Sequence, residues 1–247
     1  MERPTIPLDD LIAYLFGTGH SSLANEVGAW VASSPRFRAF AETYRDKIRK
    51  KIRGIRDEQG LRDLQFELEV AFLLLQERHF AVEYEKGGVG KQRGADFHVT
   101  FRTRIPFNVE VKHIRFSEQE QRSEEQEFSK IVNTACQKIG QLAPGMINLL
   151  VVTYDTAIHG GYDVVASMSR LRLLAEQRDD AFFLKRGFEG SRDFLKQFQR
   201  LSAVLFRSNH VAPGQAAQSI FWPNALARPR LPADLRRILE QLGASSG

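Results

Sequence analysis

The spacing of apolar residues changes abruptly at Phe80. Before this residue, apolar side chains recur with the period of an amphipathic α-helix. After it, short segments alternate apolar residues with polar or small ones, which is typical of half-buried β-strands. These segments are residues 80–84, 97–101 and 107–111. The switch from one period to the other predicts an α/β protein whose strands follow a helical N-terminal part.

Helical periods and apolar runs also account for the rest of the chain. The expected helices are residues 8–16, 21–31, 35–55, 61–75, 117–141, 164–176, 191–199 and 233–242. The expected remaining strands are residues 146–153, 202–206 and 219–222. The continuous apolar run at 146–153 suits a central strand that is buried on both faces. We therefore expect an N-terminal helical extension, residues 1–57, followed by an α/β domain, residues 58–247.

Composition narrows the class of protein. With 247 residues, 43% of them hydrophobic, the chain is large enough to bury a core. A single cysteine, Cys136, excludes an intrachain disulfide and a Cys-rich zinc site. No apolar run approaches the roughly 20 residues of a membrane helix, and the first residues, MERPTIPLDD, do not resemble a signal peptide. We expect a cytoplasmic protein without a membrane partner, and the formal charge of +5 favours a polyanionic partner.

Residues with catalytic potential gather on two successive expected strands. Asp96 opens one strand, and Glu110 and Lys112 share a face of the next because they are two positions apart. Two neighbouring carboxylates share a proton or hold a cation, and oxygen ligands suit Mg²⁺. A lysine beside them can orient or deprotonate a water that attacks a phosphate. The set indicates a metal-assisted phosphodiesterase, although each residue type is also common on a solvated strand face.

The segment GADFHVTFRTRIPFNVEVK, residues 94–112, resembles the PD-(D/E)XK nuclease superfamily, and the resemblance spans roughly residues 61–154. It implies a restriction-endonuclease-like core of order αβββαβ, in which helices flank a central mixed sheet. It also implies that Asp96, Glu110 and the backbone carbonyl of Val111 bind Mg²⁺, with Mn²⁺ as a substitute, and that Lys112 orients the attacking water. Ala95 stands where the family name expects proline, a residue without a chemical role.

The same resemblance implies two contributions from the flanking helices. A glutamate on the helix before the strands often joins the site, and Glu67 fits best, with Glu69 as the alternative. A buried carboxylate on an otherwise apolar helix is costly unless it is paired or binds a metal ion, which favours a functional Glu67. A glutamine on the helix after the strands is the second contribution, from Gln137 or Gln141.

The expected helix at 35–55 ends in a dense basic run, in which Asp46 is the only acid between positions 45 and 56. Basic clusters of this kind contact phosphates, although a solvated helix face is the alternative. The glycine-rich loop at 85–92 has the wrong spacing for a nucleotide-binding P-loop, and we expect it to bring basic residues to the mouth of the site. The predicted nucleic-acid-binding residues are Arg45, Arg49, Lys50, Arg53, Arg56, Lys91 and Arg93.

Three functional hypotheses follow. The first is a metal-dependent nuclease that hydrolyses phosphodiester bonds in nucleic acid, for which DNA is favoured over RNA as the substrate, either alone or as a homodimer. The second is a catalytically inactive nuclease-like module that binds nucleic acid or a protein partner, and the third is a hydrolase of small phosphodiesters. We do not expect His98 or His113 to bind the metal ion, and we expect Cys136 to be a core side chain.

Overall fold

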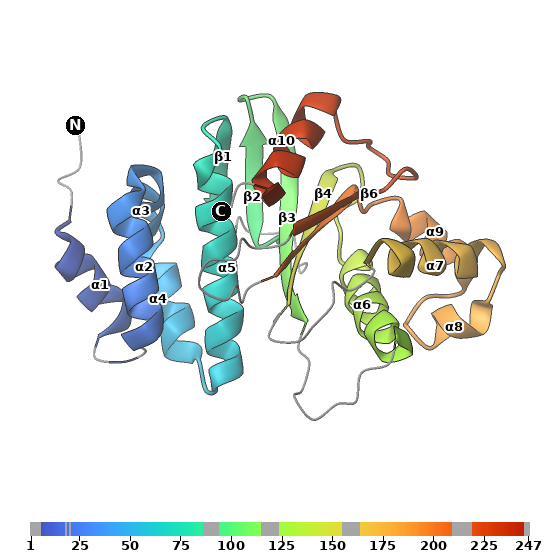
Figure 1. Cartoon of the computed structure of the whole chain (residues 1–247), viewed down its shortest axis with the longest axis horizontal. Coiled ribbons are helices and arrows are strands. Elements are labelled where there is room, and N and C mark those ends of the chain that lie inside the picture. Colours follow the sequence, from blue (N-terminus) through green and yellow to red (C-terminus); the bar gives the residue numbers. More distant parts are fainter. Residues whose placement is uncertain are drawn as a thin grey trace.

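The computed structural model describes residues 6–17, 19, 21–85, 94–114, 124–154, 164–208 and 219–244. Helices cover both faces of a central sheet, and the N-terminal helices lie at one end of the molecule (Figure 1). No helix in these ranges combines the length and the apolar character needed to cross a bilayer. The predicted α/β class, with helices flanking a mixed sheet, is confirmed.

The sheet has six strands that lie in chain order. They are β1 (Phe80–Tyr84), β2 (Phe97–Phe101), β3 (Ile105–Ile114), β4 (Ile147–Tyr154), β5 (Ala203–Ser208) and β6 (Ser219–Pro223). The pairs β3–β4 and β4–β5 are parallel, and the other neighbouring pairs are antiparallel. Every residue of β4 is buried, as its continuous apolar run predicts.

The N-terminal part of the described chain is helical, as expected. Its helices are α1 (Leu8–Phe16), α2 (Ser21–Ser33), α3 (Pro35–Thr43), α4 (Arg45–Gly54) and α5 (Glu58–Gln76). The single helix expected at 35–55 is wrong, because the chain bends at Tyr44 (φ −105°, ψ 15°). The Tyr44 ring packs against Phe40, with ring centroids 5.0 Å apart, and against Tyr84, so this bend is anchored in the core.

The start of α5 also differs from the expected position. The helix begins at Glu58, before Gly60, because the side chain of Asp57 accepts a hydrogen bond of 2.7 Å from the Gly60 N–H. A side chain that caps a helix in this way satisfies one of the unpaired N–H groups of its first turn. The cap outweighs the weak helix propensity of glycine.

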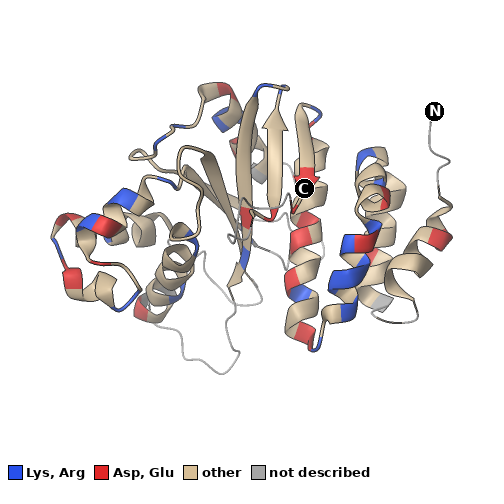
Figure 2. Ribbon diagram, turned by 180° about the vertical axis from the view of Figure 1, so that it is seen from behind, with Lys and Arg blue, Asp and Glu red and all other residues tan. Residues whose placement is uncertain are grey.

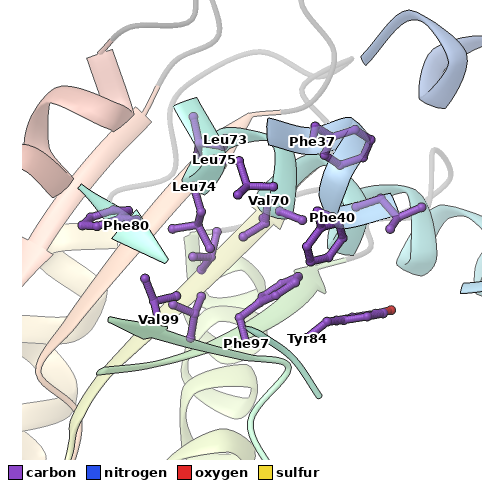
Figure 3. Close-up of a cluster of buried hydrophobic side chains, with 14 of the residues drawn as sticks. Phe37, Phe40, Val70, Leu73, Leu74, Leu75, Phe80, Tyr84, Phe97 and Val99 are labelled. Atoms are coloured by element: carbon purple, nitrogen blue, oxygen red, sulfur yellow. The ribbon is translucent and has the colours of Figure 1, made fainter. Parts of the chain in front are cut away.

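The N-terminal helices and one face of the sheet share a single hydrophobic core. Figure 3 shows Phe37 and Phe40 of α3 close to side chains of α5 and to Tyr84 and Phe97 of the sheet. The Arg36 guanidinium adds a polar clamp, since it donates to the carbonyl oxygens of Leu75 and Glu77 at 2.6 Å each. The described helices of the N-terminal extension, α1 to α4, are therefore packed directly on the α/β part.

A second hydrophobic cluster covers the opposite face of the sheet. It involves α6 (Glu124–Ile139), α7 (Val164–Glu176), α8 (Asp180–Leu184) and α9 (Ser191–Phe198), whereas α10 (Ala233–Ala244) packs into the first cluster. The short helix α8 was not expected from the sequence, because five residues are too few to display a helical period. Of the helix expected at 117–141, residues 117–123 lie outside the described residues, and the described part is α6, which ends at Ile139. The other helices and the strands lie within a few residues of their predicted positions.

Candidate functional site

Side chains from α5, α6 and the adjoining part of β2 and β3 meet around one partly open pocket of about 210 Å³. We call it the site pocket. It is lined by Asp63, Phe66, Glu67, Asp96, Val111, Lys112, His113 and Lys138. Positions 67, 96, 112 and 138 are far apart in the sequence, so it is the fold that brings these charged groups together.

The two strand carboxylates are placed by the antiparallel pairing of β2 with β3. Phe97 lies opposite Val109, so Asp96, the residue before β2, lies next to the part of β3 that contains Glu110 and Val111. Asp96 Oδ2 accepts a hydrogen bond of 2.8 Å from the Val111 N–H. Both acids are largely buried, with exposed fractions of 7% and 8%. The hydrogen bond to Val111 ties Asp96 to the residue between Glu110 and Lys112, so the fold brings the two carboxylates to the same part of β3.

Glu110 and Lys112 share the face of the sheet that α6 covers. Their partners on β4, Leu150 and Val152, both belong to the second hydrophobic cluster. Glu110 does not itself line the site pocket, because its Oε2 accepts from the Lys138 Nζ at 2.6 Å. Lys138 therefore stands between this carboxylate and the pocket that Lys112 also lines.

Glu67 reaches the pocket from α5. Burial raises the pKa of its carboxyl above the usual range, the neighbouring Lys51 ammonium opposes this shift, and the negative charge of Asp96 adds to it. The Lys51 Nζ forms an ion pair with Glu67 and a second one, at 2.7 Å, with Glu85. Glu69, the alternative from sequence, instead lies 3.4 Å from Arg207 of β5 and does not line the pocket.

The expected glutamine does not reach the pocket. Gln137 and Gln141 are both exposed, and Lys138 is the residue of α6 that lines it. Thr134 and Ala135, one helical turn earlier, are buried, so Lys138 lies on an inward-facing part of α6. The sequence analysis missed this lysine. A lysine on the buried face of a helix needs an acidic partner, because an unpaired buried charge is costly, and this requirement could have identified it.

Two histidines and the cysteine of this region pack against other protein groups. The His113 ring packs on Phe66, with centroids 4.3 Å apart, on the face opposite Glu110 and Lys112. The His98 ring lies 3.1 Å from the Asn108 side-chain oxygen. Cys136 is buried in the second hydrophobic cluster, as predicted, and burial raises the pKa of its thiol to about 12.

The predicted nucleic-acid-binding residues of α4 lie on its surface, and Figure 2 shows this basic helix beside the acidic positions of α5. Arg49, Lys50 and Arg53 line a hollow between α1 and α4. Arg45 is exposed next to it, and Arg56 lines a further hollow at the junction of α4 with α5. The other two predicted contacts, Lys91 and Arg93, lie outside the described residues.

The donor chemistry decides whether a metal ion suits the site. In the part of the chain that the structure describes, no group of three or more His, Cys, Asp or Glu side chains is arranged to hold a metal. The set expected from the sequence needs only Asp96, Glu110 and the Val111 carbonyl. All three are oxygen donors, the type of ligand that Mg²⁺ prefers, so the chemistry of the set fits Mg²⁺. Lys138 already forms an ion pair with Glu110 and would compete with the metal ion for this carboxylate.

Comparisons of the chain with protein-family models, with curated proteins and with solved structures found no match.

Proposed function

We propose that the chain is a Mg²⁺-dependent nuclease that hydrolyses phosphodiester bonds in nucleic acid, with DNA preferred over RNA. The observation that carries the proposal is that Glu67, Asp96 and Lys112 line one pocket, while Asp96 accepts a hydrogen bond from the N–H of Val111, the residue after Glu110. This combination of carboxylates with a lysine, open on one side, suits the attack of water on a phosphate. The excess of basic residues favours a polyanionic substrate.

Each residue of the proposed site has a distinct part in the reaction. Asp96, Glu110 and the Val111 carbonyl would hold the Mg²⁺ ion, which supplies positive charge to the phosphate when it is bound. Lys112 orients the attacking water and stabilises the negative charge that develops on the phosphate. Glu67, whose pKa is raised by burial, can exchange a proton closer to neutral pH than an exposed glutamate can.

Substitution of Lys112 tests the proposal directly. The purified protein should cut DNA with Mg²⁺ and not with EDTA, and Lys112→Ala should lower the cleavage rate by about 10²- to 10⁴-fold. Lys196→Ala, which removes an exposed lysine of α9, is the matched control and should cut at the wild-type rate. Equal rates for Lys112→Ala and the wild type would reject the proposed chemistry.

A catalytically inactive nuclease-like module is the second candidate function. It is favoured by the ion pairs of Glu67 with Lys51 and of Glu110 with Lys138, since each lysine neutralises a carboxylate that the reaction needs. This candidate predicts salt-sensitive binding of nucleic acid and no cleavage with any divalent ion. The assay described for Lys112→Ala separates the two functions.

A further inference from the structure

A hollow of about 250 Å³ lies between α1 and α4, apart from the site pocket. We call it the Tyr14 hollow. It is lined by Tyr14, Asp46, Arg49, Lys50 and Arg53. None of these residues lines the site pocket, and the proposed chemistry uses none of them.

The aromatic ring in this hollow is both exposed and held in place. Tyr14 is 37% exposed, which makes it one of the large hydrophobic side chains that the protein leaves on its surface. Its hydroxyl donates to Asp46 Oδ1 at 2.6 Å, and the Arg49 guanidinium carbon lies 4.1 Å from the ring centre. The Arg49 guanidinium therefore lies over the ring, and the two planar groups form one fixed stack on which a nucleic-acid base can continue the stacking.

The charges around the ring suit a phosphate backbone. Lys50 and Arg53 are exposed, and within the described residues neither forms an ion pair with an acidic side chain. The one acid of the hollow, Asp46, is engaged by the Tyr14 hydroxyl. The hollow therefore combines a stacking platform with two cations that are available to phosphates.

We propose that the Tyr14 hollow is a binding subsite for one nucleotide of a single-stranded polynucleotide. The base stacks on Tyr14 and Arg49, and the adjoining phosphates contact Lys50 and Arg53. A single strand is chosen over a duplex because the bases of a duplex are stacked on each other and cannot present a face to an aromatic ring. The inference rests on the proposed function, whose substrate class it narrows.

The position of the hollow relates it to the site pocket. Gly54 ends α4 beside Arg53, and a Cβ built on it would meet no atom of the described residues within 4 Å. On its other side Gly54 lines a hollow of about 400 Å³, which shares Asp63 and Glu67 with the site pocket. Arg53 of the Tyr14 hollow is thus the sequence neighbour of Gly54, which lines the hollow that adjoins the site pocket.

Binding measured in EDTA tests the inference without any need for cleavage. Fluorescence anisotropy would compare a labelled mixed-sequence single-stranded oligonucleotide with its duplex, for the wild type and for Tyr14→Leu. We expect Tyr14→Leu to weaken single-strand binding by about 5- to 150-fold, the loss of one stacked base, and to leave duplex binding unchanged. Tyr14→Phe keeps the ring and should bind single strands nearly as the wild type does.

Two further variants keep the test decisive if Tyr14→Leu fails to fold. Lys50→Ala and Arg53→Ala change exposed side chains, and each should lower the slope of log Kd against log salt for the single strand by about 0.7. Lys185→Ala, an exposed lysine after α8, is the control and should leave the slope unchanged. Wild-type single-strand binding by a folded Tyr14→Leu, an unchanged slope in both Lys50→Ala and Arg53→Ala, or an equal loss for single strand and duplex would overturn the subsite.

The failure of this inference is distinguishable from the failure of the nuclease proposal. A wild-type protein that binds single strands through Tyr14 but never cuts them in Mg²⁺ supports the subsite and rejects the nuclease. A protein that cuts DNA normally while Tyr14→Leu binds as the wild type rejects the subsite alone.

Discussion

Two faces of α4 carry lysines or arginines, and the fold uses them in opposite ways. On the inner face, Lys47 donates to the carbonyl oxygens of Tyr84 and Glu85 at 3.0 and 3.1 Å, and Lys51 pairs with Glu67 and Glu85. On the outer face, Arg49, Lys50 and Arg53 surround the Tyr14 hollow. Ile48 and Ile52, one turn apart, bury a third face in the core.

The contrast shows that a basic run does not by itself measure the charge offered to a polyanion. The inner cations are satisfied within the protein, and they connect the N-terminal helices to the end of β1 and to the site pocket. The outer cations remain on the surface. A helix that looks like one basic element in the sequence therefore contains a structural half and a half available for binding.

Among the substitutions in α4, Lys51→Met on the inner face should lower the free energy of unfolding most. The Glu67 side chain is only 14% exposed, and removal of its cation leaves a largely buried carboxylate without its ion-pair partner. Such a loss costs about 3 kcal/mol when the charge stays buried. Urea denaturation near pH 8 measures this cost, and Lys51→Arg, which keeps the charge, should recover most of it.

The destabilisation by Lys51→Met should also depend on pH, with a sign that the pKa of Glu67 fixes. Burial raises this pKa, and without the opposing Lys51 it rises further. A group whose pKa is higher in the folded than in the unfolded state stabilises the fold at low pH, and this contribution disappears as the pH rises through the folded pKa. The cost of the substitution should therefore shrink as the pH falls and Glu67 takes up a proton. A cost that is the same at pH 5 and pH 8 would mean that Lys51 acts through packing alone.

Lys47→Met, on the same face of α4, should lower the free energy of unfolding less than Lys51→Met does. Lys47 donates to two backbone carbonyl groups at the end of β1 and pairs with no carboxylate among the described residues. Loss of such hydrogen bonds costs about 1 kcal/mol, and water can replace the lysine because its side chain is exposed. Urea denaturation should show this cost at both pH 5 and pH 8, and a strong pH dependence would contradict the assignment.

The periodicity of the sequence predicts most of the fold because each element has a single dominant period. The alternation at 80–84 and 97–101 gives β1 and β2 with their observed bounds. The bend at Tyr44 could not be predicted in this way, since it depends on ring contacts with Phe40 and Tyr84, and Tyr84 lies 40 positions away in the sequence. The start of α5 was missed for a related reason, because the Asp57 cap competes with the signal from Gly60.

The site is less predictable than the fold, because the sequence reveals which residues share a strand face but not which cations reach them. The strand period alone relates Glu110 to Lys112, and the hydrogen bond from the Val111 N–H brings Asp96 to the same part of β3. The ion pair of Glu110 with Lys138 bridges two elements, and that of Glu67 with Lys51 bridges another two. The sequence predicted that Gln137 of α6 joins the site. Gln137 is exposed, and its neighbour Lys138 is the residue that lines the pocket.

Lys50→Met sharpens the comparison with the smallest expected change in stability. Lys50 is the sequence neighbour of Lys51, but it points to the outer face, where it is exposed and has no acidic partner among the described residues. Substitutions at such positions change the free energy of unfolding by less than about 0.5 kcal/mol. The same urea titrations that report on Lys51→Met should show Lys50→Met unfolding with the wild-type midpoint at pH 5 and at pH 8. If the two neighbouring lysines cost the same, the division of α4 into an inner and an outer face would be wrong, and its charges would act as one uniform surface.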